Sequence, residues 1–156
     1  MALRNIVEEG DPALRKVCKE VKEVTPRICQ LLDDLVDTMR QAYGVGLAAP
    51  QVGVLRRVCV VEVDDQVYEL INPEITFAEG DQYDDEGCLS VPGKAGKVHR
   101  PASVMVSCLN RQGEPVTYEA EGLLARAFCH EIDHLNGILY IDKADNLRYL
   151  EDDEEE

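Results

Sequence analysis

The feature that most constrains this chain is an apolar run from Leu123 to Ile138, which contains the sequence His-Glu-Ile-Asp-His at residues 130–134. Two histidines four residues apart on a helix project from the same face, one turn above the other. That spacing lets both imidazoles reach one metal ion, with Glu131 beside the open coordination position. An ionised glutamate within an apolar helix is unfavourable unless a cation lies next to it. The run therefore predicts a buried central helix that binds a metal.

A simpler alternative stays open, because a short motif also occurs by chance and an isolated histidine on an apolar helix is usually a hydrogen-bonded core residue. The chain contains three histidines. Placing two of them at this spacing favours the metal site over two unrelated core residues.

Cys88 is the candidate third ligand. It lies in the segment Asp84–Gly93, whose acids, glycines and proline make a poor environment for a core cysteine. As a thiolate, Cys88 would complete a set with His130 and His134 and leave a fourth position for water. The alternative is a free surface cysteine. Cys129 has suitable chemistry, but its side chain points about 100° around the helix from His130, so we expect it to pack.

Length and composition favour a single folded domain. The chain has 156 residues, a mass of 17.4 kDa and a formal net charge of −15. We expect one catalytic domain over residues 1–150 and an acidic, disordered tail over residues 151–156. No apolar run is long enough to span a membrane and the first residues lack a secretory signal, so a cytoplasmic protein with reduced cysteines is expected. The acidic tail disfavours direct nucleic-acid binding, and residues 94–100 form a weakly basic exception.

The hydrophobic pattern predicts one amphipathic helix and several strands. Thr25-Pro26 is a helix start, and apolar residues at helical spacing continue to about Tyr43. From residue 57 to 119 the period changes to two, which predicts antiparallel hairpins. The expected strands cover residues 58–63, 67–71, 74–77, 103–109 and 115–118. Pro73 and Pro101 are expected to mark strand ends or edges, and Gly44–Gln51 is expected to form no regular element.

A three-ligand metal site with an open position is catalytic rather than structural. The metal would lower the pKa of its bound water and Glu131 would handle the proton, which indicates amide hydrolysis by direct water attack. Two donors could stabilise the developing oxyanion: the Gln51 side chain and the backbone N–H of Leu89.

Two other functions remain as alternatives. One is a zinc peptidase of the HExxH type. The chain follows the metzincin spacing from His130 through Gly137, but Tyr140 stands where that pattern requires histidine. The other is a non-catalytic, metal-stabilised interaction module, in which Glu131 would have no role.

Three stretches together resemble the peptide deformylase family: Gly-Val-Gly-Leu-Ala-Ala-Pro-Gln at 44–51, Glu-Gly-Cys-Leu-Ser at 86–90 and the metal motif at 130–135. The resemblance extends over nearly the whole chain except its acidic end. It implies an α+β fold, with antiparallel β-sheets packed around a central C-terminal metal helix and an N-terminal amphipathic helix. It also implies removal of the formyl group from the N-terminal methionine of nascent bacterial or organellar polypeptides.

The resemblance assigns residue roles by motif position. Cys88, His130 and His134 would hold the metal, and Glu131 would be the general acid/base. Gln51 and Leu89 would stabilise the tetrahedral intermediate. Val45 and Gly46 would pair with the substrate backbone as an added β-strand.

The family commonly uses iron(II), with zinc, nickel or cobalt also able to occupy the site, and some members contact the ribosome. For this chain we expect iron(II), formyl-methionyl nascent peptides as partners, and a monomer. Transient ribosome contact is expected to use residues 94–100 rather than the tail. Cys129 stands where the best-known members have glutamine. Finally, we hypothesise an ion pair between Glu86 and Arg100 that braces the cysteine segment behind the metal.

Overall fold

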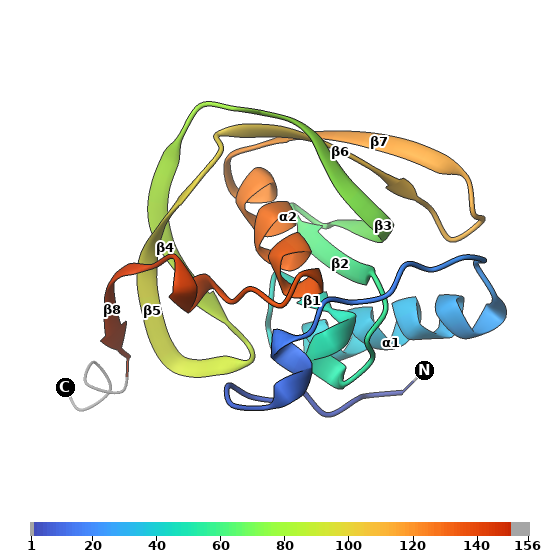
Figure 1. Ribbon diagram of the computed structural model, residues 1–156, viewed down its shortest axis with the longest axis horizontal. Helices are drawn as coiled ribbons and strands as arrows, with labels where there is room; N and C mark the ends of the chain where they lie inside the picture. Colours follow the sequence, from blue (N-terminus) through green and yellow to red (C-terminus); the bar gives the residue numbers. More distant parts are fainter. Residues whose placement is uncertain (1, 151–156) are drawn as a thin grey trace.

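The structure is a computed structural model that describes residues 2–150; Met1 and the expected tail at 151–156 lie outside the described residues. The described chain has an α+β fold with two antiparallel sheets and two α-helices, which confirms the expected class (Figure 1). The larger sheet has the order β1-β2-β3-β6-β7 and the smaller sheet the order β4-β5-β8. The strands are β1 Gly46–Ala48, β2 Val58–Val63, β3 Gln66–Glu79, β4 Gln82–Cys88, β5 Val91–Arg100, β6 Ser103–Leu109, β7 Pro115–Glu121 and β8 Asp145–Tyr149. The helices are α1 Pro26–Gln41 and α2 Gly122–Leu135.

Strand β2 is covered on both faces because a helix packs on each side of the larger sheet. Cys59 and Val61 pack in the cluster that contains α2, whereas Val58 and Val60 pack in the cluster that contains α1. Side chains alternate along a strand, so a strand covered on both faces must be apolar throughout. This explains why the sequence of β2 begins with four buried residues in succession.

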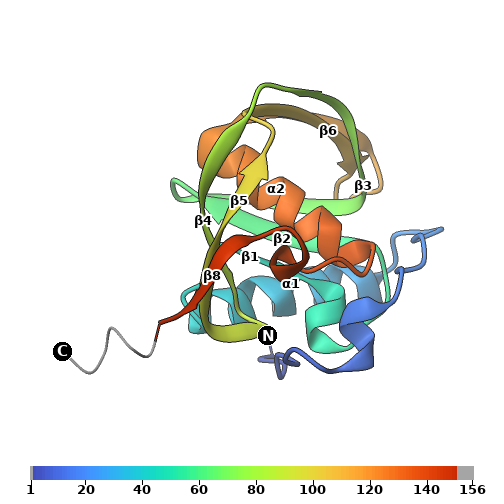
Figure 2. The ribbon, with the colours of Figure 1, turned by 60° about the vertical axis from the view of Figure 1, so that its left-hand side comes forward.

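Helix α2 lies in the interior, between the larger sheet and the smaller one (Figures 1 and 2). Phe128, Ile132 and Leu135 face the larger sheet and are buried against it. Arg126 and His130 lie on the opposite face of α2, toward β4 and β5. Helix α1 begins as the sequence predicts: Pro26 is its first residue, and the Thr25 hydroxyl accepts a hydrogen bond from the Ile28 N–H.

One expectation about loops was wrong, and it concerns the segment that contains Gln51. Gly44–Gln51 contains the short strand β1 and a 3-10 helix, Ala49–Val52, because β1 pairs with the apolar strand β2. The segment Asp84–Gly93 belongs to the β4–β5 hairpin. The β4 part of this segment lacks apolar alternation because most of that strand is exposed, and Glu86 is its one buried residue.

Pro73 does not end a strand but lies inside β3, at a shift in register between Ile71 and Glu74. Such irregularities are where proline is tolerated within a sheet, because its missing N–H leaves no bond unmade. Strand β8 was not expected at all. Each of its residues is exposed, so it has no hydrophobic pattern, and it forms by pairing with β5.

No helix within residues 2–150 is both long enough and apolar enough to cross a membrane.

Gly137, just after α2, provides a test of this packing. It has φ +75°, and an added Cβ would lie 2.7 Å from the Arg15 carbonyl oxygen. Gly53 is a matched control, since it has φ +81° and nothing within 4 Å of the same position. Gly53→Ala should lower the free energy of unfolding by about 1–2 kcal/mol through backbone strain. Gly137→Ala should lower it by about 3 kcal/mol or more, because the clash adds to the strain. Equal losses in denaturant titrations would show that the clash relaxes at no cost.

Candidate metal centre and active site

The structure brings the three expected ligands together. His130 and His134 project from the same face of α2, and Cys88 ends strand β4 opposite them. One donor atom from each of the three residues can be chosen so that all lie within 4.8 Å of one another. The Cys88 Sγ lies 3.3 Å from the His134 Nε2. The sulfur of Cys88 thus meets two imidazoles from consecutive helical turns.

The chemistry of this cluster fits a divalent metal ion. Both histidines are buried, and Cys88 is half-buried. Thiolate and imidazole donors suit iron or zinc better than magnesium or calcium. Among the described residues, Glu131 Oε1 is a buried polar atom without a hydrogen-bond partner beside this cluster. An acceptor of this kind is suited to a water held at a fourth coordination position.

Burial and hydrogen bonding together set the pKa values of Glu131 and His130. Burial raises the pKa of Glu131 to about 7, although the His130 charge opposes the shift. A carboxyl group with such a pKa can exchange a proton near neutral pH. For His130, burial lowers the pKa, but hydrogen bonds with Cys88 and Glu86 outweigh it and raise the pKa to about 10. A metal ion therefore has to compete with a proton at His130.

The backbone of β1 passes directly against Glu131. A Cβ added at Gly46 would overlap the Glu131 carboxylate, so only glycine allows this approach. The preceding Val45 is 42% exposed and lines the same pocket. The two residues expected to bind substrate are thus beside the expected proton carrier. Strand β1 is an edge strand whose second side has no partner among the described strands.

Gln51 is held rigidly in the 3-10 helix that follows β1. Its side chain is buried, and its Oε1 accepts a hydrogen bond from the Ala48 N–H at 2.9 Å. Its Nε2 donates to the Ser90 hydroxyl at 3.1 Å and lies 3.5 Å from the Cys88 Sγ. The amide N–H groups are therefore directed toward the cysteine side of the cluster. Leu89, which follows Cys88, lines the same pocket.

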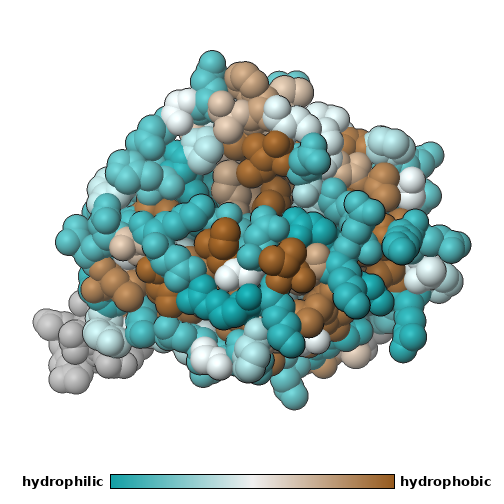
Figure 3. All heavy atoms as spheres, viewed as in Figure 1, coloured by the Kyte–Doolittle hydropathy of each residue, from teal (hydrophilic) through white to brown (hydrophobic). Residues whose placement is uncertain are grey.

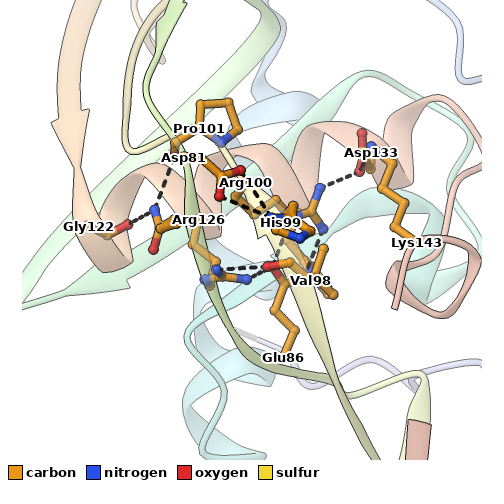
Figure 4. A network of polar contacts seen from close by, with 12 residues as sticks. Asp81, Glu86, Val98, His99, Arg100, Pro101, Gly122, Arg126, Asp133 and Lys143 are labelled. Atoms are coloured by element: carbon orange, nitrogen blue, oxygen red, sulfur yellow. Dashed lines mark hydrogen bonds and ion pairs between the residues drawn. The ribbon is translucent and has the colours of Figure 1, made fainter. Parts of the chain in front are cut away.

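Glu86 organises the polar side of α2, as Figure 4 shows. The Arg100 guanidinium donates two hydrogen bonds to its carboxylate, at 2.8 and 2.9 Å. Arg126 donates a third at 2.6 Å, and His130 Nδ1 lies 2.8 Å from Glu86 Oε1. Burial raises the pKa of Glu86, but the hydrogen bonds from Arg100 and His130 outweigh it and hold the pKa far below its usual range. The hypothesised Glu86–Arg100 ion pair is present, and Glu86 also orients a candidate metal ligand.

A role for Arg126 was not predicted from the sequence, because the run from Leu123 to Ile138 is apolar in overall character. A signal was available: Arg126 lies four residues before His130 and eight before His134, on the same helical face. A role for Ser90 was not predicted either; its hydroxyl accepts a hydrogen bond from the Gln51 amide. Cys129 is buried in the core cluster of α2, so it packs as expected.

One expectation about the surface needs correction. Arg100 is 3% exposed and forms ion pairs with Glu86 and Asp133, so it contributes no charge to a basic surface at residues 94–100. His99 lies beside Asp81, and Lys94 forms an ion pair with Glu9. Acidic partners therefore neutralise much of this segment.

A pocket of about 390 Å³ opens onto the cluster. Cys88, His130 and Glu131 line it together with Gln51, whereas His134 lies behind them and does not line it. Most of the pocket wall is apolar, and the polar groups converge at its buried end. A buried set of three metal donors beside a carboxyl group of raised pKa, open to an apolar pocket, is typical of a metal-dependent hydrolase.

Comparisons with known proteins identify the family. The family model described as Polypeptide deformylase matches residues 3–149. A peptide deformylase of Acetivibrio thermocellus is 59% identical over 156 residues, covering 100% of this chain and 91% of that protein. One of Carboxydothermus hydrogenoformans is 56% identical over 147 residues, covering 94% of this chain and 97% of that protein.

Solved structures agree with this assignment. The peptide deformylase of Thermotoga maritima has a TM-score of 0.91 and 39% identity, covering 93% of this chain and 99% of that chain. That of Synechococcus elongatus, solved in complex with actinonin, has a TM-score of 0.89 and 40% identity, covering 92% of this chain and 79% of that chain. The chain belongs to the peptide deformylase family and is an enzyme. The family match favours neither the zinc peptidase nor the interaction module.

Removing the charge of Glu86 tests its role behind the metal site. Glu86→Gln should lower metal affinity about 10–100-fold, because His130 loses the carboxylate that orients it. It should also lower the free energy of unfolding by about 3–5 kcal/mol, because the buried Arg100 and Arg126 lose their shared partner. Metal titration and denaturant unfolding measure the two effects.

Glu62→Gln is the matched control, since Glu62 forms an ion pair with the exposed Arg40 on the surface. Metal affinity should stay unchanged in this variant. Unchanged affinity in Glu86→Gln as well would remove the proposed link between Glu86 and the metal site.

Proposed function

We propose that this enzyme removes the formyl group from the N-terminal methionine of nascent polypeptides and releases formate. The observation that carries the proposal is the buried cluster of Cys88, His130 and His134 with Glu131 beside it at the end of an apolar pocket. The names of its relatives support the same reaction. Residues 1–150 act as a single catalytic domain.

Cys88, His130 and His134 hold the metal in this proposal. When bound there, a divalent ion would polarise the formyl carbonyl and lower the pKa of a water molecule. Iron(II) is the native ion that we propose, and the same donors also suit zinc, nickel or cobalt. Glu86 keeps the His130 ring in place through its hydrogen bond to Nδ1.

Glu131 moves the proton. Its carboxylate accepts a proton from the water that attacks the formyl carbon, and then gives a proton to the departing amine as the C–N bond breaks. The pKa of about 7, which burial produces, suits both steps. The products are formate and a polypeptide with a free N-terminal amine.

Gln51 and Leu89 stabilise the negative charge that develops on the formyl oxygen. The Gln51 amide is already fixed by Ala48 and Ser90, so no reorganisation is needed during the reaction. The backbone N–H of Leu89 supplies the second donor next to Cys88.

The substrate backbone pairs with the open edge of β1 at Val45 and Gly46, as an added antiparallel or parallel strand. The apolar pocket wall then receives the methionine side chain. The partners are formyl-methionyl nascent peptides, the site of action is the cytoplasm of a bacterial-type cell, and the enzyme is a monomer. Contact with the ribosome is transient and does not use the acidic tail.

Formate release from a formyl-methionyl peptide, measured after anaerobic purification and metal analysis, tests the reaction. Cleavage of internal peptide bonds without formate release would support a peptidase instead. Binding of such peptides without turnover would support the interaction module.

Replacing Glu131 separates proton transfer from metal binding. Glu131→Ala should retain the metal, because Glu131 is not among the proposed ligands, and should lose about 10²–10⁴-fold in kcat. Glu121→Ala is the control next to the same helix, since the exposed Glu121 precedes α2 and lies outside the pocket. Full activity in metal-loaded Glu131→Ala would exclude Glu131 as the proton carrier.

Gln51→Ala tests the oxyanion donor. Loss of one fixed donor should lower kcat by about 10²–10³-fold, with a smaller change in KM, because the interaction strengthens in the transition state. A change confined to KM would assign Gln51 to substrate binding alone.

A further inference from the structure

Tyr43 is an unusual residue at the mouth of the pocket. It follows α1 with φ +59°, in the left-handed region that favours glycine. The Gly44 N–H donates to the Met39 carbonyl and the Tyr43 N–H donates to the Arg40 carbonyl. These two hydrogen bonds define a helix end in which the left-handed position is normally glycine.

The adjacent Gly44 does not occupy that position. An added Cβ at Gly44 would lie 2.6 Å from Leu89 Cδ1, so a larger residue here would displace the Leu89 side chain. The chain therefore places its glycine one residue after the left-handed position and a tyrosine in it. This arrangement is less favourable for folding than a glycine in the left-handed position would be.

Nothing in the folded chain explains the tyrosine. Its side chain is 96% exposed, and within residues 2–150 it has no hydrogen bond, ion pair or ring contact. A strained residue with an exposed aromatic ring at the edge of an active site points to a role in binding.

Tyr43 belongs to an apolar rim around the pocket mouth. We define the rim by four large, exposed hydrophobic side chains that line the pocket: Tyr43, Val45, Leu123 and Leu150. They come from four separate places in the chain, namely the end of α1, the residue before β1, the start of α2 and the residue after β8. On the face that Figure 3 shows, apolar side chains reach the surface in patches among polar ones.

Strand β8 brings Leu150 to the rim. The Leu150 N–H donates to the Gly93 carbonyl at 2.7 Å, and Gly93 also lines the pocket. Arg148 forms an ion pair with Asp85, and Lys94 lies over the Tyr149 ring. The rim side chains line the same pocket as Cys88 and Glu131, so a chain bound in this pocket lies beside them.

We propose that the rim, with Tyr43 as its main contact, is a specificity determinant that favours apolar side chains in the two residues after the formyl-methionine. This inference rests on the proposed function. The first side chain enters the pocket, and the following residues leave between the rim side chains. An apolar residue there buries surface against Tyr43, whereas a glycine or a glutamate does not.

The experiment compares kcat/KM for formyl-Met peptides with leucine, glycine or glutamate at each of the two following positions. The intact enzyme should prefer leucine. In Tyr43→Gly, kcat/KM for the leucine peptides should fall about fivefold relative to the glycine peptides, mainly through KM. Tyr43→Phe should restore the preference, because the contact needs the ring and not the hydroxyl.

Asp65→Gly is the matched control for strain. Asp65 has φ +63° in the turn between β2 and β3, outside the pocket. Both glycine variants should unfold at an equal or higher denaturant concentration than the intact chain, whereas only Tyr43→Gly should lose the leucine preference.

An unchanged leucine preference in Tyr43→Gly overturns this inference, and so does an equal loss on leucine and glycine peptides, which would indicate a general structural effect. Formate release without any preference in the intact enzyme also overturns it but leaves the proposed function standing. Absence of formate release from every peptide overturns both.

Discussion

The site depends on one buried carboxylate. Glu86 is 7% exposed and accepts hydrogen bonds from two arginines while it holds a histidine. An ionised carboxylate in the interior is stable only when such partners surround it. Arg100 also pairs with Asp133, whereas Glu86 is the carboxylate that Arg126 contacts. The interaction joins β4, β5 and α2. It therefore fixes the hairpin that carries Cys88 against the helix that carries both histidines, which is the relation that a three-ligand metal site requires.

Helix α2 combines two tasks that its sequence separates by face. Phe128, Ile132 and Leu135 bury one face against the larger sheet, so the helix cannot shift along or rotate in its groove. His130 and His134 lie on the opposite side, next to Glu86 and Cys88 of β4, while Glu131 lies against Gly46 of β1. Tight packing on the first face gives the second face the precision that metal binding and proton transfer need. The burial that results also raises the pKa of Glu131.

Much of the fold and most of the candidate site could be predicted from sequence, for physical reasons that differ by element. Helix α1 is marked by apolar residues at helical spacing, and α2 by an apolar run that contains two histidines four residues apart. Cys88 could be grouped with these histidines because thiol and imidazole groups are common ligands of the same metal ions. The strands of the exposed hairpin and β8 could not be predicted, because pairing with distant segments forms them and no apolar alternation marks them. A role for Arg126 could not be predicted, because a single charged residue in an apolar run has no evident partner until the structure places Glu86 beside it.

Strand β1 has three residues, and its open edge offers only main-chain groups next to Glu131. In the function proposed above, this edge binds the substrate through main-chain groups, which every polypeptide has in common. An enzyme that binds its substrates in this way can act on polypeptides of unrelated sequence. The close contact at Gly46 leaves no room for a side chain that would make this edge selective. Discrimination between substrates then lies with the rim side chains, which can vary without changing Glu131 or the three candidate metal ligands.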